Sequence, residues 1–112
     1  MKTLITLQQA LYTYGKTHSQ ADSPISVYPS EYSCEHQITF DPKTASSGTV
    51  AATYKPLSIE GPEPLKDVYG AAVVFDASQG QKTVIVRLRA GEIIFTGTSL
   101  NGTFDIAVSG MI

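Results

Sequence analysis

The stretch from Ile93 to Val108 has the sequence IIFTGTSLNGTFDIAV, and it gives the strongest indication of the fold. Runs of β-branched and aromatic residues lie on either side of Asn101-Gly102, the pair most favoured where both residues of a tight turn need a positive φ. In the second run Phe104, Ile106 and Val108 share one face, and small or polar residues take the other. The stretch therefore predicts a β-hairpin with one buried face.

The same pattern of short apolar segments extends back to about residue 36. Strands are predicted over residues 37–40, 49–55, 68–75 and 83–90, because each alternates or is β-branched and ends at Pro, Gly or Asp. Six or seven such strands without alternating helices predict a mainly β fold, either an antiparallel β-sandwich or a small barrel. The expected core residues are Ile38, Phe40, Val50, Val74, Val84, Val86, Leu88, Phe95, Phe104, Ile106 and Val108.

The N-terminal part of the chain has a different pattern. Apolar residues recur at steps of three and four over residues 3–14, which predicts a short amphipathic helix that packs on its own domain or on a neighbouring subunit. Residues 15–33 contain Pro24, Pro29 and several Ser and Thr without a sustained period, which predicts an extended arm. We therefore expect a helix and arm over residues 1–35 and a β-sandwich domain over residues 36–112.

Length and charge exclude several classes of protein. The chain has 112 residues, with 42% apolar and 16% charged residues, which suits one folded domain and excludes a multidomain enzyme. A net charge of −2 argues against a nucleic-acid partner, which needs a basic surface. No apolar run approaches the roughly 20 residues of a membrane-spanning helix, and Gln8 and Gln9 interrupt the N-terminal apolar patch before a secretory signal could form. We expect neither a membrane partner nor an export signal.

Candidate reactive residues are few. Cys34, the single cysteine, and His36 would share one face of a strand, where they could act as a metal pair or a nucleophile pair. Metal binding would need further ligands such as Glu31 or Glu35. The other acidic residues are scattered over turns and loops, and no phosphate-binding loop is present. We therefore expect no catalytic, cofactor or metal site, and a protein that is not an enzyme.

Candidate contact residues are easier to find. Arg87 and Arg89 form the one local basic pair, on the strand face opposite Val86 and Leu88. Tyrosines in loops suit a partly wet contact, because a large ring carries a polar tip. The expected interface residues are Leu4, Leu7, Leu11, Tyr14, Tyr28, Tyr32, Arg87 and Arg89.

Four short motifs carry a resemblance to a known class of protein: Gly48-Thr49-Val50, Tyr54-Lys55-Pro56, Ile94-Phe95-Thr96-Gly97 and the segment 102–110. Over residues 36–112 the chain resembles small bacteriophage virion proteins with an immunoglobulin-like β domain. Such proteins decorate capsids, cement neighbouring capsomers or attach to heads and tails, usually as trimers. The resemblance implies a homo-oligomer that is made in the host cytoplasm, is found in the virion, and binds the major capsid protein or another virion protein.

Two other functions remain open from the sequence. The first is a small binding module, either an inhibitor of a host protein or a carbohydrate-binding domain, that uses Tyr28 and Tyr32. The second is an enzyme that uses Cys34 and His36. The expected function is that of a non-enzymatic virion subunit, a capsid decoration or cement protein or an accessory head or tail component.

Overall fold

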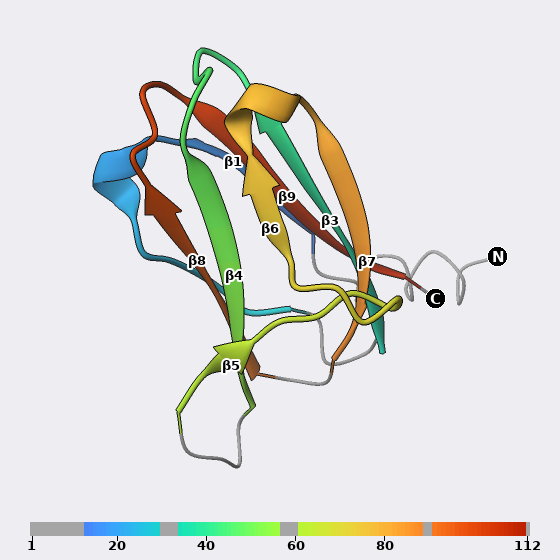
Figure 1. Cartoon of the computed structure of the whole chain (residues 1–112). Coiled ribbons are helices and arrows are strands. Elements are labelled where there is room, and N and C mark those ends of the chain that lie inside the picture. Colours follow the sequence, from blue (N-terminus) through green and yellow to red (C-terminus); the bar gives the residue numbers. More distant parts are fainter. Residues whose placement is uncertain (1–12, 30–33, 57–60, 89–90, 112) are drawn as a thin grey trace, which may run out of the picture.

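The computed structural model describes residues 13–29, 34–56, 61–88 and 91–111, which form two β-sheets packed face to face (Figure 1). Two single turns of 3-10 helix, η1 and η2, lie between strands, and these ranges contain no α-helix. The elements in chain order are β1 (Thr13–His18), η1 (Gln20–Asp22), β2 (Ile25–Val27), β3 (Glu35–Pro42), β4 (Thr49–Pro56), β5 (Glu63–Pro64), β6 (Val74–Asp76), η2 (Ala77–Gln79), β7 (Lys82–Arg87), β8 (Gly91–Thr98) and β9 (Phe104–Met111).

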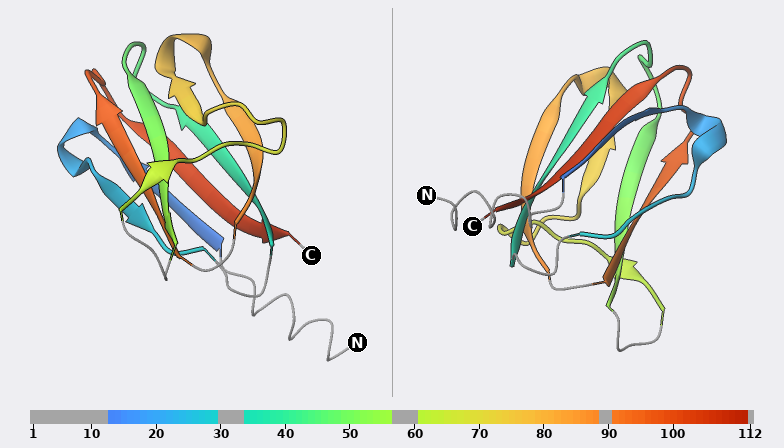
Figure 2. Two further views of the ribbon diagram at one scale, coloured as in Figure 1. Left: turned by 60° about the horizontal axis from the view of Figure 1, so that its bottom comes forward. Right: turned by 180° about the vertical axis from the view of Figure 1, so that it is seen from behind.

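The strand order is that of a jelly roll. The first sheet has the order β1-β9-β3-β7, which Figure 2 shows from behind, and the second has the order β2-β8-β4-β5 with β6 also paired to β4. All these pairs are antiparallel. Apart from the connections around β5, each connection between consecutive strands crosses to the other sheet, as in double Greek-key jelly rolls. The predicted antiparallel sandwich is confirmed, but its strand order is not the immunoglobulin one.

The hairpin predicted at Asn101-Gly102 is wrong, because β8 and β9 belong to different sheets. Ser99, not the predicted pair, has the positive φ in this connection, at 57°. The Asn101 side chain holds the β3–β4 loop instead: Oδ1 accepts from the backbone N–H of Ser46 at 2.8 Å and of Ser47 at 3.2 Å, and Nδ2 donates to Ser46 Oγ at 2.9 Å. The Asn101 side chain thus links the β8–β9 connection to the β3–β4 loop, both of which cross from one sheet to the other.

The core lies between the sheets and is aromatic at its centre. Phe40 of the first sheet stacks on Phe75 of the second, with ring centroids 5.3 Å apart, and Phe104 lies 5.7 Å from Phe40. All the predicted core residues are buried except Val74, which is 42% exposed. Its neighbours Val73 and Phe75 point inward. Because consecutive residues from Val73 to Phe75 are all apolar, the sequence does not indicate which of them face the core.

The strand predicted over residues 68–75 is mostly a loop. β5 and β6 lie in line along β4, and residues 65–73 leave that line as an excursion, which we call the Asp67 loop. The backbone N–H of Val73 donates to the carbonyl of Leu65 and closes the base of the loop. At the far side Val68 N–H donates to the carbonyl of Ile85, so the loop caps the edge of β7.

The N-terminal predictions need two corrections. Thr13 and Tyr14, the end of the helix predicted over residues 3–14, belong to β1, and residues 1–12 lie outside the described residues. The predicted arm over residues 15–33 contributes most of β1 and all of β2, which pair with β9 and β8. Periodicity does not reveal them, because β1 contains a single large apolar residue, Tyr14, and β2 has only three residues next to Pro24. Residue 35 therefore does not separate an arm from the sandwich.

Candidate functional site

The predicted interface residues do not form one group. Tyr14 lies in the core at 9% exposure, whereas Tyr28 is 62% exposed and Arg87 lies on the surface, where its Nε donates to Glu35 Oε2 at 2.8 Å. Five others lie outside the described residues: Leu4, Leu7, Leu11, Tyr32 and Arg89. Of the described set, Tyr28 and Arg87 are therefore in a position to contact another molecule.

Cys34 and His36 do not lie on the same strand, because β3 begins at Glu35. Cys34 is exposed and precedes β3, whereas His36 is fully buried inside the first sheet. Within the described ranges no three His, Cys, Asp or Glu side chains are placed to hold a metal ion, and no helix there is long and apolar enough to cross a membrane. The two residues that we considered for metal binding or nucleophilic catalysis thus differ in their exposure to solvent.

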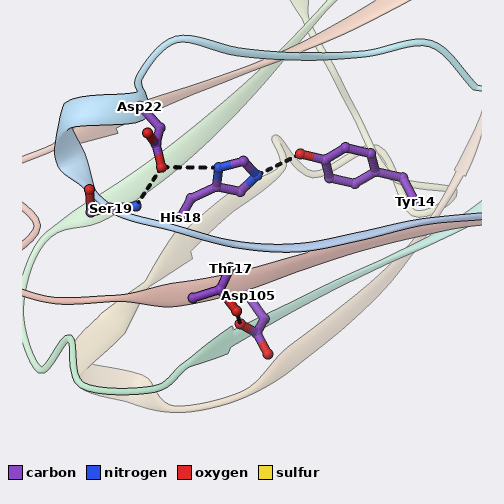
Figure 3. A network of polar contacts seen from close by, with 6 residues as sticks. All are labelled: Tyr14, Thr17, His18, Ser19, Asp22 and Asp105. Atoms are coloured by element: carbon purple, nitrogen blue, oxygen red, sulfur yellow. Dashed lines mark hydrogen bonds and ion pairs between the residues drawn. The ribbon is translucent and has the colours of Figure 1, made fainter.

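Tyr14 and His18 of β1 and Asp22 of η1 form a network of polar contacts (Figure 3). The Tyr14 hydroxyl lies 2.5 Å from His18 Nε2, and Asp22 Oδ2 lies 3.2 Å from His18 Nδ1. The backbone N–H of Ser19 donates to Asp22 Oδ2 at 3.0 Å, and this bond, with the bond to His18, lowers the pKa of Asp22 below 3.8. The Tyr14 side chain of this network is buried, so the network is suited to fixing the β1–β2 turn.

Charge on the strands is concentrated at their ends. In β3, β4 and β6 to β9 every Asp, Glu, Lys and Arg occupies one of the first two or last two positions. The residues concerned are Glu35, Asp41, Lys55, Asp76, Lys82, Arg87, Glu92 and Asp105. Lys16, at the fourth of the six positions in β1, is the exception, but it is the register partner of buried Ile106 and therefore lies on the inward side of its strand. The middle of the outer face of each sheet is thus uncharged within the described residues.

Small or uncharged side chains cover these two areas. On the first sheet one cross-strand row runs through Gly15, Ala107, Thr39 and Thr83, and the Thr39 and Thr83 hydroxyls are 3.0 Å apart. On the second sheet Ala51 lies between Thr96 and Val74. The neighbouring row of that sheet consists of Ser26, Ile94, Thr53 and Pro64. We call these areas the uncharged faces.

Two hollows adjoin at the end of the sandwich that contains Pro56, near β5 in Figure 1. The larger, of about 380 Å³, is lined by Tyr54, Pro56, Glu63, Pro64, Leu65, Lys66 and Arg87. The smaller, of about 220 Å³, is lined by Tyr28, Lys55, Pro56, Gly91 and Glu92. Pro56 is the wall that they share, and each also contains a tyrosine, a lysine and a glutamate.

The Asp67 loop carries an exposed aromatic residue that the sequence analysis missed. Asp67 Oδ1 accepts from the backbone N–H groups of Tyr69 and Ala71, at 2.9 and 3.0 Å, and Gly70 has a φ of +85°. Tyr69 is 92% exposed at the tip of this hydrogen-bonded turn. The combination Asp67-Val68-Tyr69-Gly70 has the composition of a turn, but its apolar surroundings led to the strand prediction.

Comparison with known proteins supports the fold and leaves the function open. No known protein family and no curated protein matches the chain. The SPBc2 prophage-derived protein YomS has a similar structure, with a TM-score of 0.54 and 9% sequence identity over 88% of this chain and 94% of that one. RmlC from Streptococcus suis, solved in complex with dTDP-D-xylose, aligns with a TM-score of 0.46 and 12% identity. The alignment covers 95% of this chain and 46% of the RmlC chain. The likeness to YomS shows a shared fold.

Proposed function

We propose that this protein is a non-enzymatic bacteriophage virion subunit, either a capsid decoration or cement protein or an accessory head or tail component. The observation that carries the proposal is the pair of uncharged faces. Charged residues are depleted from the centres of protein interfaces, because the desolvation of a buried charge without a partner is not offset by any favourable interaction. A sandwich whose outer faces are uncharged in the middle is therefore suited to packing against other subunits.

Two further observations support this function. Jelly rolls are common in viral capsid proteins, although the fold alone does not fix a function. YomS, which shares the fold, is derived from a prophage. The partners that we propose are other copies of the chain, as in a trimer, and the major capsid protein or another virion protein. The location that we propose is the virion, after synthesis in the host cytoplasm.

The experiment that tests this function uses phage particles. Particles produced from a genome that encodes the chain are purified by density gradient, and their proteins are quantified by mass spectrometry. We expect the chain in a fixed ratio to the major capsid or tail protein, and we expect that ratio to persist after a second gradient. Absence of the chain from intact particles, while it is abundant in the lysate, would contradict the proposal.

A further inference from the structure

We propose that the two hollows at the Pro56 end form one binding site for a neutral oligosaccharide. The proposal rests on the walls of these hollows and is independent of the virion role. Ligand sites in proteins are concave and carry polar groups that orient the ligand, with volumes of roughly 300–1,000 Å³. The larger hollow, at about 380 Å³, is in this range, and the smaller adjoins it at Pro56.

The charges around the hollows balance, which argues for a neutral ligand. In the larger hollow Lys66 is matched by Glu63, and Arg87 is held by Glu35 at 2.8 Å. In the smaller hollow Lys55 and Glu92 occupy partner positions on β4 and β8. The walls of the larger hollow contain two cations and one carboxylate, and Glu35, which lies beside the hollow, offsets the charge of Arg87. A phosphate or an acidic peptide is bound through a net positive charge, which is cancelled here once Glu35 is counted.

The same walls suit the chemistry of a sugar. A sugar hydroxyl both donates and accepts hydrogen bonds, so it can donate to the carboxylates of Glu63 or Glu92 and accept from Lys55 or Lys66. The C–H face of a pyranose ring is apolar and packs on aromatic rings and prolines, which Tyr28, Tyr54, Pro56 and Pro64 supply. Because each hollow repeats the set of Tyr, Pro, Lys and Glu, we infer that each receives one part of a longer chain of sugars.

The walls are also held in place before any ligand arrives. Gly91 lies directly against Tyr54: a Cβ at this position would come within 2.8 Å of Tyr54 Cε1 and 2.6 Å of the Lys55 carbonyl oxygen. Leu65 N–H donates to the carbonyl of Ala52, which attaches the start of the Asp67 loop to β4. Such pre-organisation lowers the entropy lost when a ligand binds.

The test is a titration of the full chain with neutral oligosaccharides of glucose, galactose or N-acetylglucosamine, followed by NMR chemical shifts of backbone amides. We expect at least one of these sugars to shift the amides of Tyr28, Lys55, Lys66 and Glu92. Tyr28→Ala, at a largely exposed residue that leaves the core intact, is expected to weaken binding about tenfold or more. Glu92→Gln, which keeps the shape of the side chain and removes its charge, is expected to weaken binding as well.

The matched control is Tyr69→Ala, because Tyr69 is more exposed than Tyr28 and lines neither hollow. Unchanged sugar binding by this variant supports the proposal, and an equal loss in both tyrosine variants overturns it. Inorganic phosphate serves as the anionic probe. Shifts at these residues with phosphate but with none of the sugars, or no shift with any sugar at about 10 mM, would also overturn it.

Discussion

Phe75 and Val74 are neighbours in β6, and they show that a shift of one position along a strand changes a side chain from buried to exposed. Phe75 is fully buried and stacks on Phe40, whereas Val74 is 42% exposed. We expect Phe75→Ala to lower the free energy of unfolding by about 3–5 kcal/mol, through lost burial and a cavity between the sheets. Val74→Ala is the matched control, with an expected change of about 0.5 kcal/mol or less. Urea unfolding followed by circular dichroism measures both, and equal losses would contradict the assigned faces of β6.

Asp22 gives a prediction of pH dependence at the same scale. The bonds from Ser19 N–H and His18 lower its pKa from 3.8, so the folded protein binds this proton less readily than the unfolded chain. The stability that Asp22 contributes is therefore present above pH 3.8 and is lost as the pH falls through the lower folded value. We expect Asp22→Asn to unfold at lower urea than the wild type at neutral pH, and the two unfolding midpoints to converge in acid. Midpoints that stay equally far apart at every pH would show that the carboxylate charge is not the cause.

At the scale of elements, the Asn101 side chain joins two connections that cross between the sheets. Its three hydrogen bonds to Ser46 and Ser47 are exposed to solvent, and each contributes a modest net stability. We expect Asn101→Ala to lower the free energy of unfolding by about 1–2 kcal/mol in urea unfolding. Asn101→Asp keeps the acceptor for the Ser46 and Ser47 N–H groups and is expected to lose less. If the aspartate variant were as unstable as the alanine variant, the bonds accepted by Oδ1 would not carry the effect.

The strands and their buried faces could be predicted from the sequence to a large extent, but their pairing could not. Alternation placed Ile38, Phe40, Val84 and Val86 correctly in the core, because the period of two along a strand is a local property. The hairpin at Asn101-Gly102 was wrong because turn propensity indicates a reversal of the chain and does not show in which sheet the next strand pairs. The strand predicted over residues 68–75 was mostly wrong because residues 65–73 leave β4 as a loop that bonds to β7 through the backbone N–H of Val68, a contact between distant segments that local composition does not indicate.

At the scale of the whole molecule, the candidate sites could be predicted only in part. Tyr28 and Arg87 were identified as contact residues, and they line the smaller and the larger hollow respectively. Each hollow is assembled from residues far apart in sequence, such as Tyr54 and Arg87 in the larger and Tyr28 and Glu92 in the smaller, so no local motif predicts either of them. The uncharged faces did have a signal, since charges at strand ends are visible once the strands are placed.

Self-association measured by native mass spectrometry and sedimentation velocity tests the central claim, that the uncharged faces are contact surfaces, most directly. The wild type is expected to form a defined oligomer at micromolar concentration. Thr96→Glu, which places a charge in the middle of the face of the second sheet, is expected to shift the protein to monomer, since burying an unpaired charge is costly. Thr98→Glu adds the same charge at the last residue of β8. Other strands already have charged residues at their ends, so this variant is expected to remain oligomeric. A wild type that stays monomeric at every concentration, or an oligomer that tolerates a charge at position 96 as well as at position 98, would contradict the account.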